Sequence, residues 1–307
     1  MIKNTDMANP LLSSQLRKHE IPGRVAIAGG TGGLPKIIIS ADRSAAEIYL
    51  HGAHITSFQK KGELPLVFMS RKSHFQNGEP IRGGVPIIFP WFGARENSPS
   101  HGFARLAEWE LTNTSAAANG DVKLVFALPE DVSIKANEPA VKMNFIVTVS
   151  DELTMELDIT NLSSKNFTFE NCLHTYFEVG DINQISISGL EQSPFDDFAA
   201  GAGGARRPAE NSVLRITKET NRVYFDSPQT VEIRDEKLKR AIRVEKFNSK
   251  STVVWNPWTT QKLPGDFDPP EYQNMVCVES GDVKQNKITL LPNHTSELKV
   301  VVSSKQI

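Results

Sequence analysis

Cysteine is almost absent from this sequence, which has only Cys172 and Cys277 among its 307 residues. Two cysteines are too few for a framework of disulfide bonds, so we expect buried, free thiols. The first ten residues, MIKNTDMANP, lack the apolar core of a secretory signal peptide. No apolar run approaches the length of a membrane-spanning helix. These absences predict a soluble, cytoplasmic protein with no membrane partner.

An excess of charge of one sign is also missing. The chain has 34 lysines and arginines against 36 aspartates and glutamates, which gives a formal net charge of −2. Nucleic-acid-binding domains usually carry a basic surface, so we expect no nucleic-acid partner. The composition leaves the oligomeric state open, and a monomer is compatible with it.

Helical signals are scarce, and the clearest is a short helix within residues 9–20. Most of the chain alternates between apolar and polar residues instead. In residues 153–160, for example, leucine, methionine and isoleucine occupy every second position, which is typical of a strand with one buried face. Many such strands predict an all-β protein, arranged as a large antiparallel sandwich or barrel.

The same alternation predicts where the strands pair. Residues 143–177 are expected to form a three-stranded antiparallel meander, and residues 231–247 and 286–304 are expected to form two hairpins. Further strands are expected at residues 35–40, 45–51, 54–59, 65–70, 122–128, 184–190 and 251–255. Strands continue on both sides of the glycine-rich residues 199–208, so we interpret these as a loop and not as a domain linker. The chain is therefore divided into an N-terminal extension, residues 1–25, and a single domain, residues 26–307.

Residues 82–93, RGGVPIIFPWFG, do not fit the strand pattern. Their two prolines remove backbone hydrogen-bond donors, which excludes a central strand or a helix interior. Arg82 precedes two glycines, which allow the backbone to approach a ligand closely. An arginine can bind a phosphate through two parallel hydrogen bonds. The segment is either an anion site headed by Arg82 or a loop with a surface arginine at its edge.

Three further stretches contain side chains that can bind an anion or transfer a proton. In SHGFARLAEW, His101 and Arg105 either face one pocket or belong to a turn before a strand. In CLHTYFEV, His174 either donates a proton near neutral pH or is a hydrogen-bonded core histidine. In NMVCVESGDV, Glu279 follows an apolar run, and burial would raise its pKa toward that of a general acid or base. The other interpretation of Glu279 is a carboxylate at the edge of a strand.

The pairs Cys172-x-His174 and Cys277-x-Glu279 each place a thiol and a titratable group on one face of a strand. Four such side chains could bind a metal ion. However, these spacings are not typical of metal sites, and a carboxylate is rarely combined with thiolates. We therefore expect no metal and no other cofactor, and we interpret the cysteines as ordinary buried thiols.

Five blocks, which occur in order over about residues 40–300, carry a family resemblance: IRGGVPIIFPWFG, HGFAR, LHTYFEV, VVWNPW and EYQNMVCVESGDV. Together they resemble the glucose-6-phosphate 1-epimerase (hexose-6-phosphate mutarotase) branch of the aldose 1-epimerase superfamily. The resemblance implies that residues 26–307 form a large antiparallel β-sandwich, the galactose-mutarotase-like β-supersandwich. It also implies a sugar-phosphate substrate, a hexose 6-phosphate whose α and β anomers are interconverted without a cofactor.

The resemblance also implies residue roles. His174 and Glu279 match the catalytic residues of the family, and the substrate-binding residues are matched by Arg82, His101 and Arg105. In this mechanism Glu279 takes the proton of the anomeric hydroxyl, and protonated His174 donates a proton to the ring oxygen. General acid–base catalysis of this kind contributes roughly 10²–10⁴-fold.

Because of the residues at two positions, the sequence does not establish which hexose phosphate is the preferred substrate. Relatives commonly carry aspartate where this chain has Asn221, and Ser100 occupies a variable, substrate-facing position. Two other functions also remain possible at this point. One is a mutarotase for unphosphorylated aldoses, against which the two arginines argue. The other is a non-catalytic carbohydrate-binding β-sandwich, which would bind sugars on exposed aromatic residues and would not need a buried histidine–glutamate pair.

Overall fold

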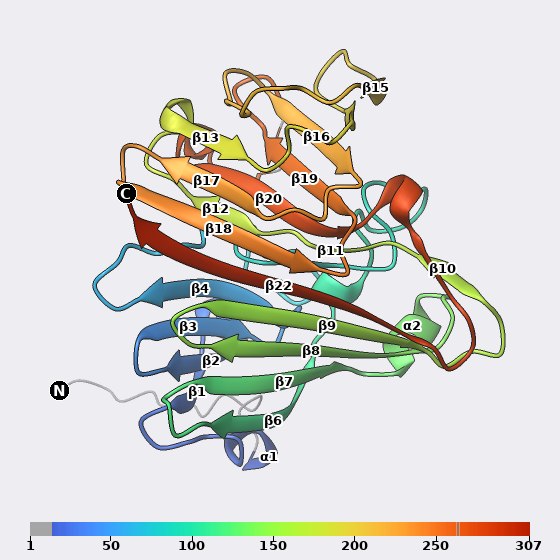
Figure 1. Ribbon diagram of the computed structural model, residues 1–307. Coiled ribbons are helices and arrows are strands. Elements are labelled where there is room, and N and C mark those ends of the chain that lie inside the picture. The colour runs from blue at the N-terminus through green and yellow to red at the C-terminus, as the bar shows by residue number, and fades with distance from the viewer. Residues whose placement is uncertain (1–13, 262, 264) are drawn as a thin grey trace.

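The computed structural model describes residues 14–261, 263 and 265–307. Its regular structure is mostly antiparallel β-sheet, so the predicted all-β class is confirmed (Figure 1). In the described residues, the α-helices are α1 (Ser14–Arg17) and α2 (Asp131–Lys135), and the 3₁₀ helices are η1 (Thr31–Gly33), η2 (Ala104–Leu106), η3 (Ile182–Gln184), η4 (Pro269–Asn274) and η5 (Lys284–Asn286). None of these helices has the length and apolar character needed to cross a lipid bilayer.

The helix expected within residues 9–20 is described only from residue 14, where α1 begins, and α1 ends at Arg17. Residues 9–13 lie outside the described part of the chain. The first strand begins at Val25, next to the expected domain boundary. The division into an extension and a single domain stays a prediction.

One eight-stranded sheet, which we call the long sheet, runs across the molecule (Figure 1). Its order is β13 (Ile185–Ser188), β17 (Val231–Asp235), β18 (Arg240–Phe247), β22 (Thr295–Gln306), β9 (Leu153–Asn161), β8 (Val141–Val149), β7 (Val122–Leu128) and β6 (Glu110–Ala116). Every pair in it is antiparallel.

A second eight-stranded sheet, the site sheet, carries the residues discussed below. Its order is β15 (Ala205–Arg207), β14 (Phe195–Asp197), β16 (Thr220–Phe225), β19 (Ser251–Asn256), β20 (Met275–Asp282), β11 (Asn171–Leu173) and β5 (Ile87–Ile88), with β12 (Tyr176–Glu178) also paired to β20. β11 and β12 follow one another along the same edge of β20.

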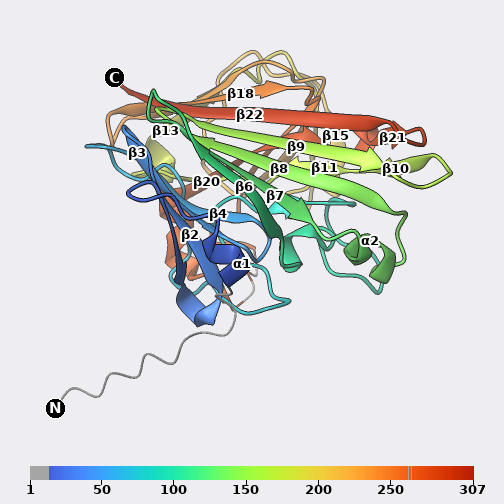
Figure 2. The same ribbon diagram turned by 90° about the horizontal axis from the view of Figure 1, so that it is seen from below.

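Two smaller sheets complete the fold. One contains β1 (Val25–Gly29), β2 (Pro35–Ser40), β3 (Ser44–Tyr49) and β4 (His54–Lys60) in chain order. The other pairs β10 (Phe167–Phe169) with β21 (Ile288–Leu290). In both views β10 lies on the side of the molecule opposite β2 and β3 (Figures 1 and 2).

The core lies between the sheets, because alternate strand residues point into it. Burial in β8 and β9 alternates along both strands, as the period of two in the sequence predicts. Leu153, Met155, Leu157 and Ile159 are all at most 1% exposed. They belong to one continuous apolar cluster that includes strands of the long sheet, the site sheet and the β1–β4 sheet.

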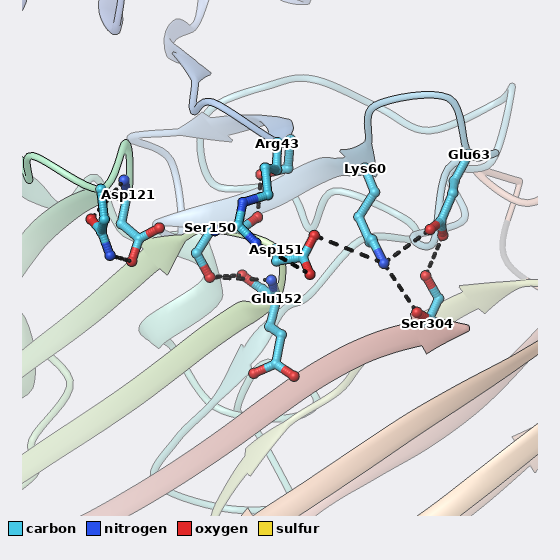
Figure 3. Close-up of polar contacts among 10 residues, drawn as sticks. Arg43, Lys60, Glu63, Asp121, Ser150, Asp151, Glu152 and Ser304 are labelled. Carbon is cyan, nitrogen blue, oxygen red and sulfur yellow. Dashed lines mark hydrogen bonds and ion pairs between the residues drawn. The ribbon is translucent and has the colours of Figure 1, made fainter. Parts of the chain in front are cut away.

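A polar network joins the β1–β4 sheet to the long sheet (Figure 3). Lys60, at the end of β4, forms an ion pair with Glu63 at 2.9 Å and donates a hydrogen bond to the carbonyl oxygen of Ser304 on β22 at 3.1 Å. The hydroxyl of Ser304 donates to the Glu63 carboxylate. Asp151, in the turn between β8 and β9, lies 4.0 Å from the Lys60 ammonium and 3.9 Å from the Arg43 guanidinium. These contacts bring three segments that are distant in sequence to one edge.

Three strand pairings differ from those expected from the sequence. β8 and β9 form a hairpin, but the third strand of the expected meander leaves the long sheet, because β9 pairs with β22 instead. Residues 286–304 do not form a closed hairpin, since β21 pairs with β10 and β22 with β9. Residues 65–70 make isolated bridges and not a strand. Local alternation predicts a strand but does not specify its partner, which depends on contacts between distant segments.

Candidate active site

A cavity of about 470 Å³ opens over one face of the site sheet. Strands β16, β19 and β20 contribute Asn221, Val223, Val253, Trp255 and Glu279 to its lining. Loop residues add to it, including those of segment 92–105 and also Gln261, Leu263 and Phe267. All five residues selected from the sequence line it: Arg82, His101, Arg105, His174 and Glu279. Asn221 and Ser100 line the same cavity. The structure thus brings together side chains that are almost 200 positions apart in the sequence.

The segment 82–93 crosses the sheets irregularly, as its prolines predict. Ile87 and Ile88 make the short strand β5, which pairs with β11. Gly84 has a φ of +64°, and a Cβ there would lie 2.3 Å from the carbonyl oxygen of Ile55. Only glycine fits such a close backbone approach. This packing fixes Arg82 at the edge of the cavity.

Arg82 is held by two neighbours. Its Nε and Nη2 atoms each lie 3.1 Å from the same carboxylate oxygen of Asp266, and Nη1 lies 3.4 Å from the hydroxyl of Tyr176. Asp266 is itself buried, at 5% exposed. The guanidinium is therefore oriented by a buried counter-ion before any ligand arrives.

Arg105 has no such counter-ion among the described residues. It lies in η2, is 7% exposed, and donates from Nη2 to the carbonyl oxygen of Ser100 at 2.7 Å. Its Nε is buried without a hydrogen-bond partner in the described structure. Burial, together with the charge of Arg82, lowers the pKa of Arg105 to about 10, which still leaves it charged at neutral pH. Since no carboxylate neutralises it in the described structure, the positive charge of Arg105 is available to bind an anion.

His101 is a neutral side chain in this site. Its φ of +65° turns the chain back toward Gly93, whose backbone N–H donates to His101 Nδ1 at 3.3 Å. Burial, followed by the charges of Arg105 and Arg82, lowers the pKa of His101 to about 3. The ring also packs edge-on against His174, with centroids 5.6 Å apart.

His174 and Glu279 form a close pair at the bottom of the cavity. His174 Nε2 lies 3.1 Å from Glu279 Oε1. The histidine sits at the break between β11 and β12 and stacks on Tyr176, with centroids 4.9 Å apart and an interplanar angle of 19°. The glutamate projects from β20, and its other oxygen, Oε2, lies 3.7 Å from the Cys172 thiol, which can donate to it.

Burial shifts both pKa values of this pair in the direction that disfavours charge. Removal from water raises the pKa of Glu279 well above its ordinary value, and the Cys172 thiol and Arg105 only partly oppose this. Removal from water, then His101 and Arg105, lowers the pKa of His174 well below its ordinary value. Both shifts favour the neutral form of the pair, in which Glu279 carries a proton and donates it in a hydrogen bond to His174 Nε2. Such a pair can give a proton to one oxygen and accept one from another.

The residues that could hold a metal ion overlap with this pair. Suitable ligand atoms of His174, Cys277 and Glu279 all lie within 4.8 Å of one another, and all three residues are buried. Cys172, the fourth residue of the metal alternative, is not in this group. Both cysteines are free thiols, as expected.

Several contacts at and beside the cavity were not predicted from the sequence. Lys284 follows the β20 strand and reaches the cavity, where its Nζ lies 3.4 Å from the carbonyl oxygen of Phe92. Asp266 lies in an irregular loop, and its role as the counter-ion of Arg82 depends on a contact 184 positions away. Trp255 faces the cavity from β19 and donates from its indole nitrogen to Gln261 at 2.9 Å. Spacing could not predict these contacts, because they cross between distant loops.

The chain is similar to a known protein family and to individual members of it. The family model described as aldose 1-epimerase matches residues 35–303. A protein of Cenchrus ciliaris named "Putative glucose-6-phosphate 1-epimerase" is 31% identical over 283 residues, covering 89% of this chain and 85% of that protein. A protein of the same name from Escherichia coli is 34% identical over 251 residues, which cover 80% of this chain and 83% of that protein.

A solved structure supports the same relationship. The crystal structure titled "a putative mutarotase (YeaD) from Salmonella typhimurium" superimposes with a TM-score of 0.86 at 27% sequence identity. The match covers 94% of this chain and 96% of that one. The mutarotase-like β-sandwich expected from the sequence is therefore confirmed.

Proposed function

We propose, from the premise that the chain belongs to the aldose 1-epimerase family, that it interconverts the α and β anomers of a hexose 6-phosphate. Membership makes the protein an isomerase that acts on an aldose at its anomeric carbon. It also sets aside the non-catalytic carbohydrate-binding alternative. The substrate that we propose is glucose 6-phosphate, in line with the names of the relatives.

One observation carries the proposal. A hydrogen-bonded pair, His174 and Glu279 at 3.1 Å, lies in a cavity that is also lined by Arg82, Arg105 and Lys284. The pair is suited to exchange protons on two neighbouring oxygens, which an anomeric carbon provides. The three cationic side chains are suited to a dianionic phosphate. The same cavity therefore contains an acid–base pair and cationic side chains for the phosphate, and the proposed reaction needs both.

In the proposed reaction, Glu279 as carboxylate takes the proton of the anomeric hydroxyl, and protonated His174 gives a proton to the ring oxygen. The bond between C1 and the ring oxygen breaks, and its electrons remain on that oxygen as it is protonated. The open-chain aldehyde then turns about the C1–C2 bond. Ring closure on the other face of the carbonyl returns both protons and yields the opposite anomer.

The charged form of the pair arises from the neutral form by transfer of one proton along the existing hydrogen bond. Burial makes this form less populated, but it also makes each group more reactive. A histidine with a lowered pKa is a stronger acid once protonated, and a glutamate with a raised pKa is a stronger base once ionised. Bound phosphate would offset the charges of Arg82 and Arg105, which otherwise oppose protonation of His174.

Phosphate recognition is assigned to the arginines in this proposal. Arg105 lacks a carboxylate partner in the described structure and can offer its full charge, whereas Arg82 is already oriented by Asp266. Lys284 adds a third cationic side chain to the lining of the cavity. The free thiols of both cysteines agree with the cytoplasmic location that we also propose.

The test is NMR exchange spectroscopy with purified protein, which measures the rate of exchange between the α and β anomers directly. We expect exchange of glucose 6-phosphate to be accelerated far more than exchange of glucose or galactose at equal concentration. Equal acceleration of the three sugars would support the mutarotase for unphosphorylated aldoses instead. No acceleration of any sugar would refute the proposed activity.

A further inference from the structure

Cys277 is a completely buried residue of β20 that has no part in the proposed reaction. It lies two residues before Glu279 on β20, so both side chains point to the same face of the site sheet. Its partners across the sheet are Tyr176 and Trp255, two aromatic residues that line the cavity. Its thiol is buried beside the His174–Glu279 pair.

We propose that His174, Cys277 and Glu279 form a binding site for a thiophilic divalent cation such as Zn²⁺, and that the bound ion inhibits the enzyme by occupying the catalytic pair. One nitrogen, one sulfur and one oxygen ligand atom lie within 4.8 Å of one another. A tetrahedral zinc site needs ligands at about 2.0–2.3 Å from the ion, so the atoms of a site lie less than about 4 Å apart. The present separations of up to 4.8 Å exceed this limit by less than about 1 Å, so binding requires the three side chains to move closer together.

The chemistry of the three ligands selects the kind of ion. Zinc is commonly held by cysteine, histidine and carboxylate, and three protein ligands leave a fourth position open. Here that position faces the cavity, where water or a substrate oxygen can occupy it. Binding releases two protons to solvent, one from the Cys277 thiol and one from the His174–Glu279 pair, because the ligands are a thiolate, a neutral imidazole and a carboxylate. The ion thereby removes the proton exchange on which the reaction depends.

The surrounding charges oppose binding of a cation and make it selective. Arg82 and Arg105 repel any divalent ion, but a thiolate and a carboxylate together supply two compensating negative charges. Mg²⁺ and Ca²⁺ prefer oxygen ligands and would gain little from Cys277. We therefore expect Zn²⁺ to bind and Mg²⁺ not to bind.

Cys172 provides a matched control within the same chain. It is also a buried free cysteine, and its thiol lies 3.7 Å from Glu279 Oε2. However, it is not in the cluster formed by the other three residues. Replacement of either cysteine therefore removes a buried thiol next to the same carboxylate, but only one of them removes a ligand.

The first experiment uses Co²⁺ as a spectroscopic probe and does not depend on the proposed activity. The wild-type protein and Cys172→Ala should show an absorption band of cobalt–thiolate charge transfer that added Zn²⁺ abolishes. Cys277→Ser and Cys277→Ala should lack this band while keeping the wild-type circular dichroism spectrum. Absence of the band in the wild type, or its persistence in folded Cys277→Ser, would overturn the proposal.

The second experiment rests on the proposed function, because it measures inhibition of anomer exchange. Zn²⁺ should compete with glucose 6-phosphate, EDTA should restore activity, and Mg²⁺ should have no effect. Loss of one outer contact of a metal site costs about 10–100-fold in affinity, so loss of the Cys277 ligand should raise the inhibition constant at least about tenfold, relative to each variant's own zinc-free rate. If no exchange activity exists, the cobalt band still decides the metal site. Inhibition that is unchanged in Cys277→Ser would contradict it.

Discussion

His174 and Glu279 are almost completely removed from solvent, at 8% and 1% exposed. In water a histidine and a glutamate would titrate near their ordinary pKa values of about 6.5 and 4.3. In this cavity burial raises the pKa of Glu279 well above its ordinary value and lowers that of His174 well below its ordinary value, which favours the neutral, hydrogen-bonded pair. The environment of each residue, more than its type, therefore accounts for the acid–base chemistry that we propose.

The role of the carboxylate can be tested with Glu279→Gln, which keeps the shape of the side chain but cannot ionise. We expect kcat for anomer exchange to fall by at least about 10²-fold, because a general base is lost. The control is Glu178→Gln, which alters a half-buried carboxylate at the end of β12 and should leave the rate close to wild type. Near-normal exchange in Glu279→Gln would exclude this residue from the mechanism.

The proposed phosphate contacts of Arg82 and Arg105 can be tested in the same way, by substitution of single residues. The phosphate is remote from C1, so its contacts contribute similarly to the ground and transition states and affect KM more than kcat. A charge-assisted hydrogen bond contributes about 1.5–3 kcal/mol, so Arg105→Met and Arg82→Ala should each raise KM for glucose 6-phosphate by about 10–100-fold. Arg82→Lys should recover only part of the loss, because lysine lacks the planar fork.

Glucose is the control for both variants, because it has no phosphate. The rise in KM should largely disappear with this substrate. Arg82→Ala also leaves Asp266 buried without its counter-ion, so thermal unfolding should be measured alongside. An equal loss with glucose and glucose 6-phosphate would mean that the arginines shape the loops or bind the sugar ring.

At the scale of single elements, strand β20 contributes side chains to the apolar core on one face and carries the catalytic glutamate of the proposed mechanism on the other. All eight of its residues are buried, and it is paired on both edges, to β19 on one side and to β11 and β12 on the other. Val276 and Val278 point into the main apolar cluster, so Cys277 and Glu279 must point to the opposite face, toward the cavity. Packing of the alternate valines thus holds the glutamate in place.

Lys246, on β18, links the long sheet to the site sheet. Its ammonium donates hydrogen bonds to the carbonyl oxygen of Ser227 and to the hydroxyl of Thr252 on β19. The residue is 6% exposed, and no carboxylate lies within 4 Å of its ammonium in the described structure. Burial lowers the pKa of Lys246 to about 7, far below that of an unfolded lysine at about 10.4.

This shift predicts how stability depends on pH. Between about pH 7 and pH 10 the unfolded chain keeps the proton of Lys246 while the folded chain loses it, so the free energy of unfolding rises with pH. The slope from this group is at most about 1.4 kcal/mol per pH unit. Lys246→Met should lack this contribution. Urea unfolding should therefore show that the difference in free energy of unfolding between this variant and the wild type changes steadily from about pH 7 to about pH 10.

The matched control is Lys299→Met, on the neighbouring strand β22, whose side chain is 43% exposed. This substitution removes a lysine without removing a buried charge. A wild-type-like slope in Lys246→Met would show that Lys246 stays protonated in the folded protein.

At the scale of the whole molecule, the cavity is lined by the site sheet and by loops that pack over one of its faces. We expect dialysis against EDTA to leave the rate of anomer exchange undiminished, because the proposed mechanism needs only His174 and Glu279. The measurement compares exchange rates before and after dialysis, and after addition of single divalent ions. Loss of activity on chelation, restored by one ion, would indicate a metal cofactor in the cluster of His174, Cys277 and Glu279.

The sequence by itself determined the all-β class, most strand positions and the five residues that line the cavity. The class and the strand positions follow from local patterns, because alternation with a period of two reports which face of a strand is buried. The roles of the five residues were implied by the family resemblance. The arginine, histidine and glutamate were recognisable because each sits in a short motif whose glycines, prolines or apolar neighbours are unusual. The hairpin of β17 and β18 was also predicted correctly, since its two strands are adjacent in sequence.

Only the tertiary structure decided which strands are neighbours and how the site residues meet. The pairing of β9 with β22 joins residues about 140 positions apart, and it displaces the third strand of the expected meander. Likewise, the 3.1 Å contact between His174 and Glu279 and the ion pair between Arg82 and Asp266 connect separate segments. Strand partners and buried polar contacts depend on how all segments pack together, and a local pattern carries no information on that packing.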